Sequence, residues 1–280
     1  MSVAIDDMVA RVYGGSELGV LSLTAPGEAH PRVEYVGGDL FVGLDVDGAA
    51  LTRGQAESLP RAFGDVLARS LPPVGVFPDP LDGVVRIDDE ARAAGVLIEP
   101  ARVAELCGGD PVVFALARDA LMIVGADDEG AIGRVLDAAE ALFDEARPLV
   151  SAHPLALVDG EWAPFPLADR FPALATRVER VRRLFSVRAY ERQAPALERP
   201  DVHIAEPKIH VRDDGITLTF AAWPKGVATL LPVVDDVMIA DPSGSLSVAT
   251  MSEFLAAAGD AVVRTGLSPV RYFVPGEAPR

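Results

Sequence analysis

The sequence feature that most constrains the fold is a pattern that occurs three times along the chain. In each copy an aspartate stands at a turn or kink, an apolar strand follows it, and an amphipathic helix comes next; the aspartates are Asp39, Asp119 and Asp236. An apolar strand face must be buried against another layer, which a neighbouring amphipathic helix can supply. The pattern predicts an α+β fold in which amphipathic helices cover mixed or antiparallel sheets, built from about three repeated strand–strand–helix units. The alternative is coincidence, because an apolar strand followed by a helix is common.

Periodicity places the other elements between these copies. Thr250 and Glu253 form a capping box that opens a helix, and Pro60 must lie in the first turn of its helix because proline breaks a helix interior. The proline-rich residues 148–172 are interpreted as a surface excursion at a boundary between two closely packed lobes, residues 1–147 and 148–280. Helices are expected over residues 2–12, 55–70, 129–146, 172–192 and 250–265. Strands are expected over residues 18–24, 32–36, 39–45, 112–116, 120–124, 202–212, 216–223, 233–240 and 270–274. Residues 74–100 are expected to be irregular, with short β-like pieces.

The charge balance limits the classes of partner. The 280 residues include 42 Asp and Glu against 25 Lys and Arg, which gives a net charge of −17 at pH 7. Such a chain repels nucleic-acid phosphates and anionic lipid surfaces, so neither nucleic acid nor a membrane is predicted as a partner. Solubility alone explains the excess of acids. The alternative is an acidic face that mimics a polyanion or docks a basic protein.

The single cysteine and the absence of long apolar runs indicate the compartment. Cys107 cannot form an internal disulfide, which fits a reducing compartment. The first residues are acidic where a signal peptide requires bases, and no run reaches the roughly 18 apolar residues of a membrane span. We therefore expect a cytoplasmic protein. Cys107 is interpreted as a small buried hydrophobic residue and not as a nucleophile, because no histidine lies near it in the sequence.

Motifs for common chemistries are missing. The sequence contains no phosphate-binding loop, no dinucleotide-binding glycine pattern and no nucleophile elbow. His203 and His210 are seven residues apart on a predicted strand that would point them to opposite faces, so zinc is not expected. Residues 45–48 resemble a fragment of a calcium loop without its other ligands, which favours a glycine-containing turn. No cofactor, metal ion or catalytic residue is therefore predicted.

A basic segment contrasts with the acidic chain. Residues 170–199 contain eight arginines and three glutamates, a local excess of five positive charges. On the basic helix expected over residues 172–192, Arg180 and Arg183 lie opposite an apolar face. These two arginines are the candidate partner-binding residues, because guanidinium groups suit an acidic partner or a nucleotide. The alternative is a solvated helix face on which the arginines pair with the protein's own acids.

Four segments occur in an order that is more specific than any one of them. They are residues 108–128, 190–193, 201–205 and 223–232, the last followed by Asp235 and Asp236. This arrangement resembles the YtpQ-like family of bacterial proteins, over about residues 30–265 and weakly before residue 95. The resemblance implies a cytoplasmic α+β protein and brings no activity, cofactor or catalytic residue with it. Within these segments, Gln193 is interpreted as a bridge between elements and Trp223 as packing beneath a sheet.

Together these observations favour a non-enzymatic intracellular binding protein, acting as an adaptor, chaperone or immunity-type partner. The alternative is a hydrolytic enzyme that uses carboxylates such as Asp119, Asp128 and Asp236, which would then converge in one pocket. Asp235 and Asp236 do not readily share one proton, because neighbouring strand residues face opposite ways. A structural homo-oligomer is a third hypothesis. The sequence leaves the oligomeric state and the identity of the partner open.

Overall fold

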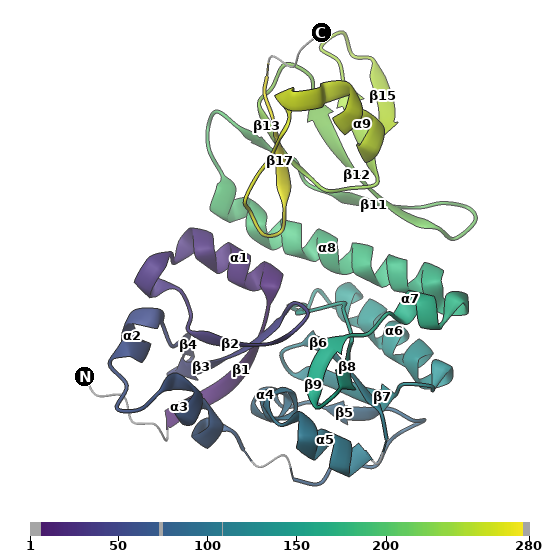
Figure 1. Ribbon diagram of the computed structural model, residues 1–280. Coiled ribbons are helices and arrows are strands. Elements are labelled where there is room, and N and C mark those ends of the chain that lie inside the picture. The colour runs from purple at the N-terminus through teal and green to yellow at the C-terminus, as the bar shows by residue number, and fades with distance from the viewer. Residues whose placement is uncertain (1–6, 73–74, 108, 277–280) are drawn as a thin grey trace. The chain divides into compact units, whose positions relative to one another are not determined.

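The protein consists of two compact units, which the computed structural model describes over residues 7–72, 75–107 and 109–276 (Figure 1). Unit 1 is Met1–Val181 and unit 2 is Arg182–Arg280. Helices and antiparallel or mixed sheets occur in both units, which confirms the α+β prediction. The division lies within helix α8 (Ala175–Leu197), whereas the sequence indicated a boundary between residues 147 and 148.

The first sheet of unit 1 is antiparallel. Its strand order is β1 (Met8–Gly14), β3 (Leu40–Val46), β2 (Val33–Gly37), and β4 (Ala49–Ala50) pairs with β3. The hairpin β2–β3 confirms the two strands predicted around Asp39. Alternate residues of β1 and β3 enter the hydrophobic core of the unit; these are Met8, Ala10, Val12, Leu40, Val42 and Leu44.

Two predictions near the start of the chain are wrong. The described part of the expected helix 2–12 is strand β1, in which buried Ala10 and Val12 alternate with the more exposed Val9 and Arg11. Such a two-residue period belongs to a strand. The expected strand 18–24 is helix α1 (Gly15–Thr24). Its apolar residues lie all around the helix and only Leu18 is buried, so no helical stripe marks it in the sequence.

The second sheet of unit 1 shares the same core. Its order is β5 (Val85–Ile87), β7 (Ala120–Gly125), β6 (Pro111–Ala117), β8 (Leu155–Val158), β9 (Glu161–Pro164), with all pairs antiparallel. Every residue of β6 is buried, as expected for a central strand covered on both faces. Helix α6 (Glu129–Asp144) contacts β6 and β7, while α4 (Glu90–Ile98) and α5 (Pro100–Cys107) precede the sheet's central hairpin.

Three further expectations for unit 1 are corrected. Residues 148–172 are not a surface excursion, because β8 pairs with β6 and both Leu155 and Trp162 are buried. Residues 74–100 contain the short strand β5, which fits the expected β-like pieces, but they also contain helix α4, which was not expected. The helix expected over residues 55–70 is two helices, α2 (Arg53–Glu57) and α3 (Phe63–Ser70), because Pro60 lies between them and interrupts the hydrogen-bonding pattern.

Unit 2 contains two four-stranded sheets and helix α9 (Met251–Ala258). One sheet has the order β10 (His203–Ile204), β13 (Thr229–Pro232), β17 (Arg271–Val274), β16 (Val263–Arg264). The other has the order β11 (Lys208–Val211), β12 (Thr217–Pro224), β14 (Asp236–Ala240), β15 (Leu246–Thr250). Trp223 is buried in the core of this unit with its ring 5.4 Å from that of Phe254, which confirms its expected place beneath the sheet.

The third copy of the repeated pattern differs from the first two. Around Asp39 and Asp119 two antiparallel strands form a hairpin, β2–β3 and β6–β7. Around Asp236 the preceding strand β13 lies in one sheet and β14 in the other, and β15 intervenes before α9 begins. The capping box that opens α9 is present, with Gln55 and Thr52 forming a second one on α2.

A fully buried arginine connects the elements of unit 2. The Arg271 side chain is completely inaccessible to solvent, and its Nε donates to Gln193 Oε1 at 2.7 Å. Its Nη1 donates to the carbonyl oxygens of Ala205 at 2.7 Å and Leu230 at 3.0 Å. The guanidinium lies 4.9 Å from the ring centre of Tyr190. Gln193, which was expected to bridge elements, therefore joins α8 to β17, and its Nε2 donates to the Pro269 carbonyl at 2.7 Å.

Candidate functional site

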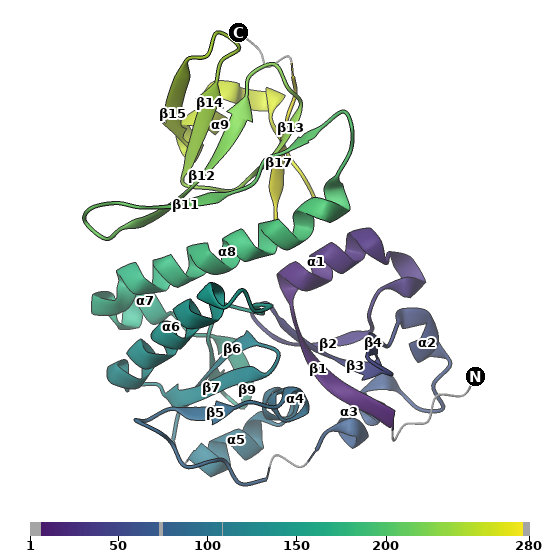
Figure 2. The ribbon, with the colours of Figure 1, turned by 180° about the vertical axis from the view of Figure 1, so that it is seen from behind.

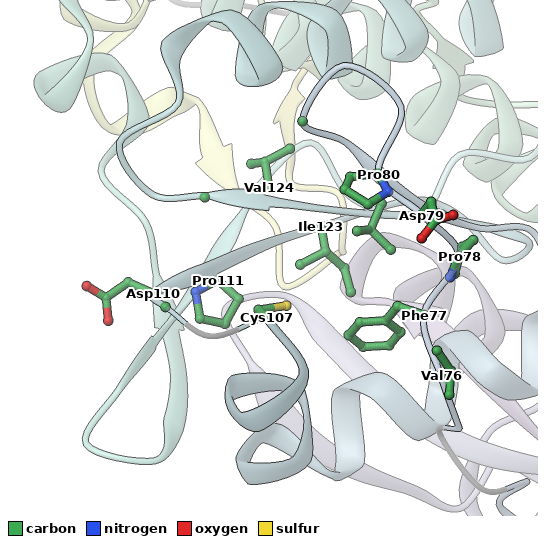
Figure 3. A pocket seen from close by; sticks show the side chains of 14 residues that line it. Val76, Phe77, Pro78, Asp79, Pro80, Cys107, Asp110, Pro111, Ile123 and Val124 are labelled. Carbon is green, nitrogen blue, oxygen red and sulfur yellow. The ribbon is translucent and has the colours of Figure 1, made fainter.

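The main candidate site is a cavity in unit 1 of about 400 Å³, here called the unit 1 pocket. Its walls come from the segment between residues 76 and 85, from the end of α5 and from the adjacent ends of β6 and β7. Figure 3 shows the side chains of Phe77, Cys107 and Ile123 approaching one another from these three parts of the chain. Most of the lining surface is apolar, which suits a ligand or anchor side chain held by burial.

Two arginines hold the loop that forms one wall of the pocket. Arg92 on α4 donates from Nη2 to the Val76 carbonyl at 3.2 Å, and Arg134 on α6 donates to the Asp82 carbonyl. Gly83, which also lines the pocket, has a φ of +80°, a conformation that an L side chain rarely adopts. The loop is therefore anchored at both ends to helices of the same unit, although it contains no helix or strand of its own.

Cys107 contributes a protonated thiol to this pocket. It is exposed, so the expectation that it is buried is wrong. Partial burial nevertheless raises the pKa of its thiol above the ordinary value. Cys107 also ends α5, where the negative end of the helix dipole disfavours a thiolate. Both effects oppose a nucleophilic role for this thiol.

Two carboxylates border the pocket. In Figure 3 the Asp110 carboxylate points away from Phe77 and Cys107, whereas Asp79 lies at the opposite end of the cavity, beside Pro78. Within the described residues, neither carboxylate has a hydrogen-bond or ion-pair partner. A ligand with an apolar body could therefore place a positive group at the Asp79 end, where the carboxylate is available.

The candidate partner-binding arginines are both engaged within their own units. In unit 1, Arg180 Nε lies 2.8 Å from Glu140 Oε2. In unit 2, Arg183 makes two 2.8 Å hydrogen bonds to the two carboxylate oxygens of Asp235. These contacts correspond to the alternative in which the helix arginines pair with the protein's acids. The structure does not test binding by Arg180 and Arg183, which stays a prediction.

Asp235 is a structural carboxylate. Burial alone would raise its pKa, but the hydrogen bonds from Arg183 and from Thr219 outweigh burial and lower the pKa of Asp235 below its ordinary value. The Thr219 backbone N–H donates to Asp235 Oδ2 at 2.7 Å and its hydroxyl donates to the same atom at 2.9 Å. This group stays ionised near neutral pH and fastens α8 to β12.

The carboxylates of the hydrolase hypothesis do not form one cluster within unit 1. Asp119, at the turn between β6 and β7, forms an ion pair with Arg147. Asp128 caps α6 by accepting a 2.8 Å hydrogen bond from the Ala131 backbone N–H. These two aspartates stand beyond opposite ends of β7, so they cannot share a pocket. Asp236, the third, begins β14 in unit 2.

A second cluster of ionisable groups is buried on the first sheet of unit 1. The Tyr13 hydroxyl donates to Asp45 Oδ1 at 2.8 Å, and Arg11 forms ion pairs with Asp45 and Glu90. Burial, followed by the hydrogen bond and charge of Asp45, raises the pKa of Tyr13 far above its ordinary value. Because the phenol is protonated and each charge has a partner, this cluster stabilises the fold and offers no poised acid or base.

The histidines and acids do not create a metal site in the part of the chain that the structure describes. No group of three or more histidine, cysteine, aspartate or glutamate side chains is placed there to hold a metal ion. His203 begins β10 and His210 lies in β11, so the two histidines that were expected on one strand belong to different sheets. Residues 205–207, between these strands, are not part of a strand. Asp47 and Gly48 form the tight turn that was expected in place of a calcium loop.

Sequence reasoning missed both the unit 1 pocket and the buried Arg271. A weak signal for the pocket is the presence of Val76, Phe77 and Leu81 among prolines in a segment expected to be irregular. A weak signal for Arg271 is its position between apolar residues of the predicted strand 270–274. Comparisons with protein-family models, curated proteins and solved structures found no match to this chain. None of the described helices has the length and apolar character that crossing a membrane requires.

Proposed function

We propose that the protein is a non-enzymatic binding protein of the cytoplasm, and that the unit 1 pocket receives an apolar side chain of a partner protein. The observation that carries this proposal is the composition of the pocket. Phe77, Ile123 and Val124 line it, together with the protonated thiol of Cys107. Partner side chains that dominate the binding energy of an interface fill apolar, desolvated pockets of this kind.

The mouth of the pocket supports an interaction with a protein. Val76, which lines the pocket, is 84% exposed, and Leu81 on the same loop is 78% exposed. Exposed large apolar side chains on a loop that lines a pocket are typical of an interaction surface. A small metabolite would leave these two side chains uncovered, whereas a peptide segment that enters the pocket would cover them.

The charge of the protein favours a basic partner. The chain carries a net charge of −17, and the Asp79 carboxylate lies at one end of the pocket. Opposite charge on a partner increases the rate of encounter and disfavours acidic competitors. The proposed ligand is therefore a segment with one large apolar residue flanked by lysine or arginine.

We also infer a relationship to the YtpQ-like family. Arg271 contacts residues from three of the segments that carry the resemblance, namely Gln193, Ala205 and Leu230. Segments that meet at one buried group are constrained together, which supports their origin in a shared fold. The hydrolase alternative gains no comparable support, since Asp119 and Asp128 have separate structural partners.

Methyl-labelled NMR tests the proposed function. A peptide with one leucine between arginines should shift the methyl resonances of Ile123 and Val124 in a saturable manner. Replacing the leucine by alanine should weaken binding by about tenfold or more, from the lost burial of the side chain. Val76→Glu should weaken binding, whereas Val158→Glu, at another exposed valine of unit 1, should not. Equal binding of the leucine and alanine peptides, or shifts that avoid the pocket, would contradict the proposal.

A further inference from the structure

The second sheet of unit 2 ends in a strand whose outer edge pairs with no strand among the described residues. Strand β15 pairs with β14 along all five of its residues and is the last strand in the sheet order. The free N–H and carbonyl groups of an edge strand can pair with a strand of another chain. Many proteins prevent such pairing by placing charged residues, prolines or bulges on their edge strands. Residues 243–250 contain none of these charges or prolines, and the pairing of β15 with β14 shows no register shift.

The register identifies the backbone groups on this edge. Asp241 N–H donates to the Ser245 carbonyl and Met251 N–H to the Asp235 carbonyl, which fixes the alternation of the antiparallel ladder. The peptide groups of Ser247 and Ala249 therefore face β14. Those of Leu246 and Val248 point outward, and no described residue bonds to them. The next outward N–H, that of Thr250, is already bonded to Glu253 Oε2 at 2.9 Å.

An apolar sheet face adjoins this edge. The register places Met238 beside Ala222 and Val248, and Ala240 beside Pro224 and Leu246. These six side chains lie on the face opposite the core, because Trp223, Val237 and Ala249 point to the other face. Leu246 is 66% and Val248 67% exposed. In Figure 2 strands β12, β14 and β15 lie in front of α9, so the helix covers only the core face.

We propose that β15 pairs antiparallel with β15 of a second copy of this chain, extending the sheet across a twofold axis. With the axis at Ser247, Leu246 of one copy faces Val248 of the other, and this register yields four backbone hydrogen bonds. It uses all the outward N–H and carbonyl groups of Leu246 and Val248 and requires none from Thr250. It also continues the apolar rows, because the Leu246 side chain meets that of Val248 on the same sheet face.

The lack of charge on the strand favours a second copy over a basic partner. Two copies of a chain with a net charge of −17 repel each other, so their contact must lie where charge is absent. The β15 strand Leu246–Thr250 meets this condition. Because one added strand pair buries a modest area, the association is expected to be weak and concentration-dependent. Raising the salt concentration should strengthen it by screening the repulsion.

Sedimentation of the full chain over a concentration series tests the proposal. The wild type should pass from monomer to dimer, and the dissociation constant should fall as salt is added. Val248→Lys should weaken the dimer at least about tenfold by placing two like charges at the contact. Val263→Lys, at an exposed valine on the edge of the other sheet, is the matched control and should leave it unchanged. Circular dichroism checks that both variants fold.

Amide hydrogen exchange provides the second measurement. The Leu246 and Val248 amides should exchange rapidly in dilute solution and slowly at concentrations that favour the dimer. The Ser247 and Ala249 amides, which face β14, should be protected in both. The proposal is overturned if the wild type stays monomeric throughout, if Val248→Lys and wild type dimerise equally, or if salt weakens the dimer. None of these outcomes bears on peptide binding at the unit 1 pocket, so the two proposals can fail separately.

Discussion

Replacing Arg271 by methionine is the sharpest test of how unit 2 is held together. The substitution removes the donors that satisfy Gln193 Oε1 and the carbonyl oxygens of Ala205 and Leu230. Each buried acceptor left without a donor costs about 1–3 kcal/mol. The Leu230 carbonyl keeps a hydrogen bond from the Ala205 N–H at 3.2 Å, so the two remaining acceptors give about 2–6 kcal/mol. Methionine retains much of the aliphatic volume and removes a desolvated charge, which offsets part of this loss. We expect destabilisation of about 2–4 kcal/mol, a large share of the stability of an ordinary domain.

The charge of Arg271 enters this argument directly. Burial lowers the pKa of Arg271 to about 10, with the neighbouring Tyr190 and Glu206 acting in the opposite direction. This pKa is well above neutral, so the side chain is a cation whose charge is solvated by carbonyl oxygens in place of water. Arg271→Lys should therefore also destabilise the unit, because one ammonium cannot reproduce the planar set of donors.

Urea unfolding followed by tryptophan fluorescence measures the effect. Trp162 lies in unit 1 and Trp223 in unit 2, so a Trp162→Phe background makes the signal report unit 2 alone. Arg212→Met is the control at an exposed arginine of the same unit and should change stability by less than about 0.5 kcal/mol. If Arg271→Met lies within about 1 kcal/mol of the parent, the buried network does not carry the stability assigned to it here.

Three other substitutions or measurements follow from the local geometry. Gly43→Ala should destabilise unit 1 by about 1–3 kcal/mol in urea, because the new Cβ would lie 2.9 Å from the Tyr13 ring; an unchanged midpoint would show that the ring can move aside. Asp235→Asn should cost about 2 kcal/mol at pH 7 by weakening the bonds from Arg183. Folding lowers the pKa of Asp235, so this carboxylate stabilises the folded state above its unfolded pKa of about 3.9, and the stabilisation is lost as pH falls through the folded pKa. Unfolding curves from pH 7 to 2 should show the Asp235 contribution in the wild type and not in Asp235→Asn. At about pH 7.5 the Cys107 thiol should react with a disulfide reagent more slowly than free cysteine, because its pKa is raised, and the reaction rate should increase with pH. A fast reaction at neutral pH would contradict a raised pKa for this thiol.

The predictable parts of the fold are those in which one local signal dominates. The hairpin β6–β7 and helix α6 were predicted within a few residues, because a continuous apolar run is followed by a capped amphipathic helix. Helix α9 was predicted from its capping box, although it ends at Ala258 and not near residue 265. In each case the sequence pattern and the tertiary packing favour the same structure.

The elements that were predicted wrongly depend on tertiary contacts. Helix α1 has no apolar stripe, so its sequence pattern favours a strand. Its only buried residue, Leu18, gives no helical period. Helix α4 was missed because its buried residues are mostly small, with Ala93, Ala94 and Gly95 among them. Such residues pack closely but give little periodic signal.

The candidate sites were harder to predict than the fold. Arg180 and Arg183 were selected for their position on a helix, but their carboxylate partners come from other elements that periodicity cannot place beside them. The pocket likewise forms from three separate parts of the chain. The pairing of residues distant in sequence is decided by the fold as a whole, and no single motif records it.

The hairpin β8–β9 has a consequence for how the chain folds during synthesis. Trp162 belongs to the core formed with β1 and β3, its indole N–H donates to the Leu97 carbonyl at 2.9 Å, and its backbone lies against Gly37. A ribosome must therefore release residue 162 before strands made much earlier can close their core. Until then the nascent chain exposes apolar surface that aggregates readily. The nascent unit 1 should accordingly be prone to aggregation, and a fragment ending at residue 147 should be insoluble, whereas one extended through β9 should be soluble.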